Sequence, residues 1–178
     1  MSVVCARVYP GEICIAADSM ITKDDLKKTN FEKLRVIEEL TVGGCGHAEE
    51  LSLFFQFVAD TEPYEPTVKG MLQYMKEFST YKENFTGNKE IENCYLIVYD
   101  NKLFEIDGMF IQEVTDYTAI GEGEPYALTA MRLDYDPEYA VKITSELCTS
   151  VSEPVICYRI MTDARAEDFT WSIYMKGI

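Results

Sequence analysis

Few side chains in this sequence are of a type and in a setting that suit catalysis. Ser2 follows the initiator methionine at the head of the apolar segment SVVCARV. Methionine is readily removed before a small residue such as serine, and a serine hydroxyl is a poor nucleophile until a neighbouring base removes its proton. Ser2 is therefore either a nucleophile that becomes the first residue of the mature chain or only a suitable residue to follow methionine.

Three further residues each allow a structural and a functional interpretation. Lys33 stands in the otherwise apolar-alternating run FEKLRVIE, although a lone lysine is more often a solvated surface residue. Asp18 ends the apolar run EICIAA, where it can pair with Lys33 or cap the polar segment that follows. Gly46, in GGCGHAEE, either makes the turn that opens a helix or lets a backbone N–H approach a substrate closely.

The cysteines and the histidine point away from metal chemistry. None of the six cysteines forms a C-x-x-C pair, so neither a zinc nor a dithiol redox motif is present. With a single histidine, His47, a histidine-based metal centre is not expected, and neither is a cofactor. We expect His47 to make local hydrogen bonds, and its neighbour Cys45 to line a pocket wall.

Length and composition indicate one acidic globular domain over residues 1–178. The chain carries 31 acidic and 16 basic residues, a formal charge of −15, whereas nucleic-acid binding draws on clustered Lys and Arg. No window reaches the roughly 18 apolar residues of a membrane span, and the N-terminus lacks the pattern of a secretory signal. We therefore expect a cytoplasmic protein with neither a nucleic-acid nor a membrane partner.

Hydrophobic periodicity predicts the elements that must position these residues. Amphipathic helices are expected over residues 48–60, 66–81, 125–134 and 137–150. Strands are expected over residues 2–8, 12–17, 31–38, 40–44, 93–99, 102–106, 109–114, 117–120, 155–160 and 169–175. Residues 18–30 are polar and predict a loop. Strands that alternate with helix pairs favour an α+β fold, a four-layer α/β/β/α sandwich of two antiparallel sheets flanked by helix pairs.

Four segments, in order, resemble the N-terminal-nucleophile hydrolases of the proteasome β-subunit and HslV type. The opening SVVCARVYPGEICIAADSMIT resembles the start of those proteins, and FEKLRV is similar to their lysine segment. GGCGHAEE resembles their Gly-x-Ala-Gly-x-x-Ala-Asp segment, and AIGEGEPYALTAMR their Ile-Gly-Ser-Gly-x-x-Tyr-Ala segment. The resemblance covers most of residues 2–150.

The resemblance implies a catalytic role for Ser2, Asp18, Lys33 and Gly46. Ser2 would be the nucleophile, with its own α-amine as the base once Met1 has been removed; an attached Met1 would convert that amine into an amide. The positive charge of Lys33 would favour the neutral amine, and Asp18 would hold Lys33 in place. The N–H of Gly46 would form the oxyanion hole.

The chain departs from the family pattern in two places. Glu122 replaces the serine of Gly-Ser-Gly, so its carboxylate could weaken the amine as a base, supplement proton transfer, or turn out to solvent. Residues 149–154 replace an acid and a Ser-Gly-Gly turn, where Glu146 or Ser152 could substitute. Glu122 and Cys45 are therefore candidate modulators of the site.

The leading functional hypothesis is a peptidase of threonine-peptidase type that uses Ser2 and works in a ring. Its implied partners are peptide or unfolded protein substrates, further copies of the chain, and an ATP-dependent unfoldase. The alternative is a catalytically silent structural subunit with the same fold. A third hypothesis is an amidase of the superfamily that acts on a small molecule.

Overall fold

The apolar runs at the start of the chain pair into a central hairpin. β1 (Val4–Tyr9) and β2 (Glu12–Ala17) are antiparallel. β10 (Tyr117–Ile120) pairs with β1 and β11 (Ile156–Met161) with β2, so the strand order is β10-β1-β2-β11. The structure, a computed structural model, describes residues 2–23, 26–28 and 30–162.

A second antiparallel sheet has its five strands almost in chain order. Its order is β5-β6-β7-β8-β9. The strands are β5 (Leu34–Ile37), β6 (Leu40–Cys45), β7 (Cys94–Tyr99), β8 (Lys102–Asp107) and β9 (Phe110–Val114). Asp100 and Asn101 connect β7 to β8 with φ values of 46° and 64°, the left-handed conformation that a tight hairpin turn requires.

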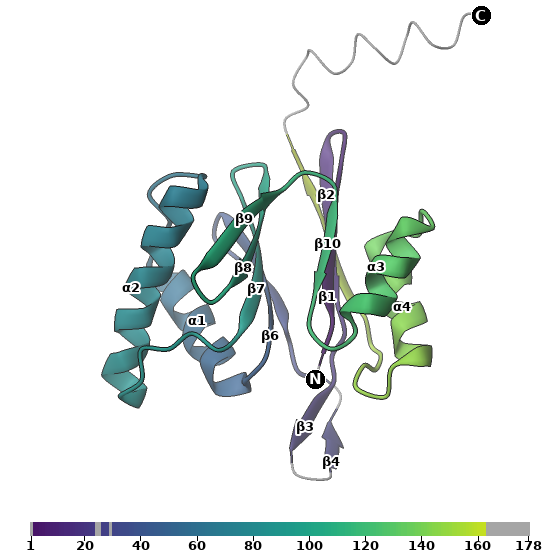
Figure 1. The fold of residues 1–178 in the computed structure, drawn as a ribbon, viewed down its shortest axis with the longest axis horizontal. Coiled ribbons are helices and arrows are strands. Elements are labelled where there is room, and N and C mark those ends of the chain that lie inside the picture. Colours follow the sequence, from purple (N-terminus) through teal and green to yellow (C-terminus); the bar gives the residue numbers. More distant parts are fainter. Residues whose placement is uncertain (1, 24–25, 29, 163–178) are drawn as a thin grey trace, which may run out of the picture.

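Two helix pairs cover the outer faces of the stacked sheets (Figure 1). The pair α1 (Ala48–Asp60) and α2 (Val68–Thr86) lies on the five-stranded sheet, whereas α3 (Glu124–Arg132) and α4 (Pro137–Leu147) lie on the four-stranded sheet. The expected α/β/β/α sandwich is thus confirmed. Of the described helices, none is long and apolar enough to cross a membrane.

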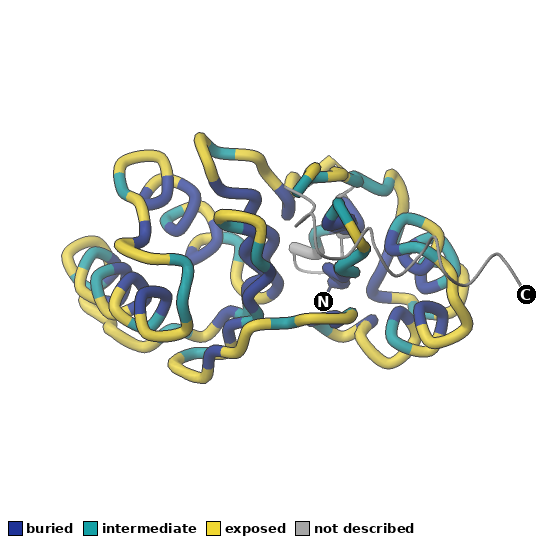
Figure 2. Tube along the Cα trace, turned by 90° about the horizontal axis from the view of Figure 1, so that it is seen from above, coloured by how far each residue is buried: buried dark blue, intermediate teal, exposed yellow. Residues whose placement is uncertain are grey.

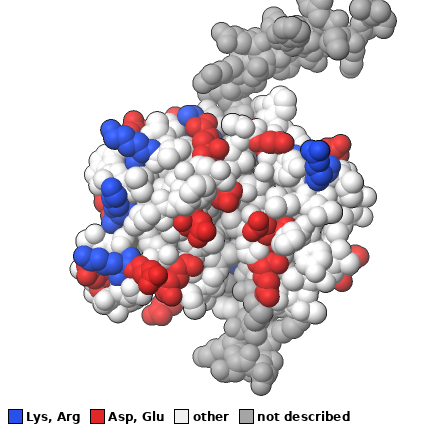
Figure 3. All heavy atoms as spheres, in the orientation of Figure 1, with Lys and Arg blue, Asp and Glu red and all other residues white. Residues whose placement is uncertain are grey.

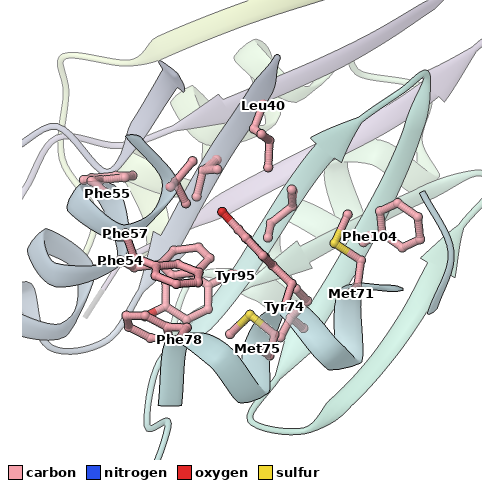
Figure 4. Close-up of a cluster of buried hydrophobic side chains, with 14 of the residues drawn as sticks. Leu40, Phe54, Phe55, Phe57, Met71, Tyr74, Met75, Phe78, Tyr95 and Phe104 are labelled. Carbon is pink, nitrogen blue, oxygen red and sulfur yellow. The ribbon is translucent and has the colours of Figure 1, made fainter. Parts of the chain in front are cut away.

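Strand alternation divides the interior into three apolar layers, seen as buried segments between exposed outer surfaces in Figure 2. Val4 and Ala6 of β1 face the other sheet, whereas Cys5 faces α3 and α4. The layer under α1 and α2 is aromatic (Figure 4), with the rings of Phe54 and Tyr95 centred 4.2 Å apart. The layer under α3 and α4 is rich in alanine, which lets these helices pack close to the sheet.

The prediction of a loop over residues 18–30 is wrong. Within that range β3 (Ile21–Lys23) and β4 (Leu26–Lys28) form a separate two-stranded ribbon, in which Ile21 is opposite Lys28. Backbone hydrogen bonds between two strands do not require an apolar side-chain pattern. The polar sequence of this ribbon therefore did not predict strands. The strand expected over residues 169–175 lies outside the described residues, as does Met1.

Candidate active site

Ser2 lies two residues before the start of β1, at the end of the inner hairpin, and is 4% exposed. Its carbonyl accepts a hydrogen bond from the N–H of Gly123 at 3.0 Å. The next residue, Val3, donates its N–H to Asp18 Oδ1 at 2.9 Å and accepts the N–H of Asp18 at 3.2 Å. The backbone around Ser2 is therefore fixed on both sides by contacts to two different loops.

Asp18 and Lys33 form a buried ion pair behind Ser2. Lys33 Nζ donates to Asp18 Oδ1 at 2.7 Å, and the two side chains are 3% and 0% exposed. The carboxylate also accepts backbone N–H bonds from Met20 at 3.0 Å and Ser152 at 3.4 Å. The buried carboxylate of Asp18 therefore has the ammonium and N–H partners that a buried charge requires.

Ser2, Lys33 and Gly46 line a single cleft with a volume of about 180 Å³. The rest of its wall consists of Met20, Ile21, Phe31, Gly44, His47, Ala48 and Leu51. Three residues that are 31 and 13 positions apart in sequence thus meet at one hollow, with Asp18 directly behind Lys33. The hollow holds a hydroxyl, an ammonium and a glycine turn next to each other.

Gly46 occupies a backbone conformation that no other residue would hold without strain. Its φ is +133°, and an added Cβ would lie 2.0 Å from Oδ1 of Asn93. The turn leads directly into α1, whose first residue, Ala48, also lines the cleft. The start of a helix carries a partial positive charge, which suits an anion that develops in the cleft.

Cys45 does not line the cleft, contrary to the expectation of a pocket wall. Strand alternation puts Gly44 and Gly46 on the cleft side and turns Cys45 into the core between the sheets. Its Sγ donates to the carbonyl of Ile120 at 3.5 Å, and burial raises the pKa of the thiol to about 12. Cys45 is therefore a protonated packing residue at neutral pH.

Glu122 is exposed and is not among the residues of the cleft wall. Of the three alternatives for this side chain, the orientation to solvent agrees with the structure. Its neighbours keep the backbone of Ser2 in place instead: Gly123 donates to Ser2, and a Cβ on Gly121 (φ +94°) would come within 2.6 Å of the Ser2 carbonyl oxygen. This loop acts on the site through its main chain.

The altered turn of residues 149–154 also reaches the site through its main chain. Ser152 donates its N–H to Asp18, and its carbonyl accepts the N–H of Ser19 at 3.3 Å. Glu146 is exposed on α4. Of the two suggested substitutes, only Ser152 contacts the site, and it does so without its hydroxyl.

Asn93 was not predicted from the sequence as a site residue; it is fully buried between the cleft turn and α1. It accepts the N–H of His47 at Oδ1 (2.5 Å) and donates from Nδ2 to the His47 carbonyl (2.9 Å). Both bonds involve the backbone of His47 and a residue distant in sequence, so local hydrogen bonding by the imidazole stays a prediction. An asparagine directly before the apolar run CYLIVY was the available signal, but it reads equally well as the start of a strand.

No protein-family model and no curated protein matches the chain. Solved structures do match. BPH from Thiobacillus denitrificans, in complex with epoxomicin, superposes with a TM-score of 0.82 at 21% identity, covering 90% of this chain and 99% of that one. A second structure of BPH gives a TM-score of 0.80 at 23% identity, with coverages of 92% and 100%.

A eukaryotic HslV, from Trypanosoma brucei, is similar over the same extent. It covers 89% of this chain and 99% of its own, with a TM-score of 0.67 at 17% identity. At 17% to 23% sequence identity, these structural matches establish a shared fold but not a shared reaction. Two antiparallel sheets between helix pairs, with a buried serine shortly before the first strand, give this chain the fold of the HslV-like N-terminal-nucleophile hydrolases.

Proposed function

We propose that this chain is an N-terminal-nucleophile peptidase that uses Ser2 after removal of Met1. The observation that carries the proposal is the meeting of Ser2, Lys33 and Gly46 at one cleft, with Asp18 joined to both Lys33 and the residue after Ser2. These are the parts that acyl transfer needs: a nucleophile, a positive charge that favours its neutral amine, and a backbone donor at a glycine turn.

The proposed reaction proceeds in two steps. The free α-amine of Ser2 takes the hydroxyl proton while Oγ attacks the peptide carbonyl carbon, and the N–H of Gly46 stabilises the oxyanion. The amine then gives its proton to the leaving nitrogen, the C–N bond breaks, and an ester on Ser2 remains. Water, activated by the same amine, attacks that ester and releases the acid.

A covalent probe tests the nucleophile directly. Epoxomicin is present in one of the similar BPH structures and is therefore the probe to use at the corresponding site of this chain. We expect intact-mass analysis to show loss of Met1 and an epoxomicin adduct at Ser2. Ser2→Thr keeps the hydroxyl and should keep the adduct and peptide turnover, whereas Ser2→Ala should lose the adduct and at least about 10³-fold in turnover.

Ser52→Ala is the matched control, because Ser52 is an exposed hydroxyl on α1 that donates to the Ala48 carbonyl. It should label and turn over peptide like the wild type. Retention of Met1 together with an unlabelled Ser2 would refute the peptidase.

The second candidate, a catalytically silent subunit, is favoured by one observation. Glu122 stands where the family has a serine and is exposed, so this position supplies no hydroxyl to Ser2. An unlabelled chain that still assembles would support it, and activity only on a panel of small amides would support the amidase.

The assembly and partners belong to the same proposal. We infer a homo-oligomeric ring in the cytoplasm that admits peptides or unfolded proteins, with an ATP-dependent unfoldase as the candidate partner. Sedimentation of the purified chain, followed by peptide turnover in each fraction, tests whether activity accompanies the assembled species. Turnover confined to the monomer fraction would contradict the ring.

A further inference from the structure

A second buried ion pair lies outside the proposed catalytic set, between α1, α2 and the start of β7. Lys82 of α2 donates from Nζ to Glu50 Oε2 of α1 at 2.5 Å, and the residues are 4% and 3% exposed. Lys82 also donates to the carbonyl of Glu90. A pair this deeply buried is no assurance of stability, because well-packed apolar side chains often do as well. The pair does, however, hold neighbouring backbone segments in place.

Glu50 is the centre of the cluster. Besides Lys82, it accepts the N–H of Glu92 at 3.1 Å, the N–H of Asn93 at 3.0 Å and the hydroxyl of Tyr95 at 2.9 Å. Burial alone would raise the pKa of Glu50, but the hydrogen bonds from Lys82 and the two N–H groups outweigh it, so the pKa lies below its usual value. The carboxylate is therefore ionised at neutral pH and orders the segment that carries Asn93.

Asn93 connects this ordered segment to the cleft through its contacts with His47 and Gly46. Its side chain makes a donor and an acceptor bond to the backbone of the same residue, His47, and packs directly on Gly46, leaving no room for a Cβ. Gly46 and His47 both line the cleft with Ser2. Because His47 N–H donates to Asn93, it is not available to a substrate, and the Gly46–His47 peptide to which it belongs is fixed in orientation. Together with the close packing of Asn93 on Gly46, this restricts the backbone dihedrals of Gly46 and thereby the direction of its own N–H.

We propose that Asn93 is a positioning residue that sets the oxyanion-binding N–H of Gly46, and that the Glu50–Lys82 pair holds Asn93 for this task. The inference rests on the proposed function, because Gly46 is given its role there. Electrostatic stabilisation of an oxyanion depends on donors that are already oriented before the reaction. A donor held only by a flexible glycine would lose that advantage, and a locked asparagine restores it.

The first test removes the clamp. Asn93→Ala should lower kcat for a fluorogenic peptide by about 10- to 100-fold with KM within about twofold, because an oxyanion donor acts in the transition state. Hydrogen–deuterium exchange at the amides of residues 46–48 should become faster. Ile106→Val is the matched control: Ile106 is buried in the same layer, so the variant is destabilised while kcat and exchange at residues 46–48 stay unchanged.

The second test uses the donor–acceptor pattern. In Asn93→Asp an ionised carboxylate can still accept from His47 N–H but cannot donate to the His47 carbonyl; a protonated one can do both. The ratio of the variant kcat to the wild-type kcat should therefore rise as the pH is lowered from about 8 to about 6, since burial beside Glu50 favours the protonated form. A purely structural role would not give such a pH profile.

The third test keeps Asn93 and removes the charges behind it. Glu50→Gln with Lys82→Met keeps one acceptor oxygen for the Asn93 N–H and the Tyr95 hydroxyl, loses the acceptor for the Glu92 N–H, and fills the volume of the lysine stem. We expect a smaller kcat loss than for Asn93→Ala and faster exchange at residues 46–48. If Asn93→Ala does not fold, kcat and amide exchange of this double variant test the positioning role instead.

The outcomes separate the two proposals. An inactive wild type whose Ser2 is not labelled refutes the proposed function, and the exchange measurement then still decides whether Asn93 fixes the turn. An active wild type whose Asn93→Ala variant keeps kcat within about twofold, or keeps the exchange at residues 46–48 unchanged, overturns the positioning role.

Discussion

At the scale of single residues, Asp18 is the most heavily used side chain of the site. Its two oxygens accept from Lys33 Nζ and from the N–H groups of Val3, Met20 and Ser152. One carboxylate therefore connects the residue before β1, the residue before β5 and the turn of residues 149–154. The two members of the ion pair are not equivalent, since removal of Lys33 leaves a buried carboxylate with only its backbone donors.

Lys33→Met should lose peptide turnover and destabilise the fold by about 3 kcal/mol, because it leaves Asp18 charged and partly uncompensated. Urea denaturation and turnover measure the two effects. Lys142→Met is the control: Lys142 pairs with Glu138 at 2.5 Å on the surface of α4, so its loss should change neither stability nor turnover measurably. Equal effects of the two variants would show that burial does not distinguish the pairs.

Gly46→Ala should destabilise the protein by about 3 kcal/mol, since the new Cβ meets Asn93 at 2.0 Å and φ is +133°. Gly87→Ala is the control for conformation alone: Gly87 has a φ of +72° and nothing within 4 Å of an added Cβ, so it should cost about 1 kcal/mol. Thermal denaturation compares them. Similar costs would mean that Asn93 moves aside freely.

At the scale of elements, hydrophobic periodicity was informative where one face of an element is buried. It gave the four helices of the described residues and the strands over residues 2–8, 12–17, 31–38, 40–44, 93–99 and 102–106, which the structure confirms to within a few residues. It could not give the β3–β4 ribbon, which is held by backbone pairing, nor the direction in which Cys45 points, since a one-residue shift in a strand reverses its face.

Some site residues could likewise be predicted from the sequence, whereas Asn93 could not. Ser2, Asp18, Lys33 and Gly46 were found because their segments resemble known proteins, and the structure brings them to one place. Asn93 had no such segment, and its partners lie 43 and 46 positions earlier in the chain. Contacts of that kind follow from the packing of α1 against β7 and are not encoded in local pattern.

The N-cap of α2 gives a prediction at this scale. The side chain of Thr67 accepts the N–H of Gly70 at 3.1 Å, so Thr67→Ala should cost about 1 kcal/mol in urea denaturation. Thr80→Ala is matched within the same helix, because Thr80 is exposed and its hydroxyl bonds only to the Lys76 carbonyl. It should change stability by less than about 0.5 kcal/mol; a cost as large as that of Thr67 would exclude capping as the cause.

The pairing of β2 with β11 places two thiols side by side. Cys14 and Cys157 have their sulfurs 3.6 Å apart. The contact between the two thiols lowers the pKa of Cys157, against the effect of its partial burial, and raises the pKa of Cys14. A lowered thiol pKa means more thiolate at a given pH below it.

Iodoacetamide should therefore alkylate Cys157 before Cys14, Cys5 and Cys45, all of which are buried with raised pKa values. Peptide mapping after short labelling at several pH values measures this order. Cys14→Ala removes the thiol that contacts Cys157, so the pH midpoint for Cys157 should move upward. A midpoint that stays in place would show that the contact does not stabilise the thiolate.

At the scale of the whole molecule, charge and apolar exposure act in opposite directions. The chain carries a net charge of −15, and Figure 3 shows acidic side chains across the middle of one broad face. Large apolar side chains are nevertheless exposed on both helical layers and on β11: Phe85, Leu133, Leu147 and Met161. Association of copies would cover such groups but must overcome repulsion between like-charged surfaces.

The ring that we propose should therefore assemble more tightly at higher salt. Repulsion acts over the Debye length, about 10 Å at 0.1 M, and shortens as salt is added, while burial of apolar surface is not weakened. Sedimentation velocity between about 0.05 and about 0.5 M NaCl should show a growing assembled fraction. KCl at equal ionic strength should give the same curve if screening is the cause. An assembled fraction that falls as salt rises would instead assign the interface to ion pairs between copies, because only those are weakened by screening.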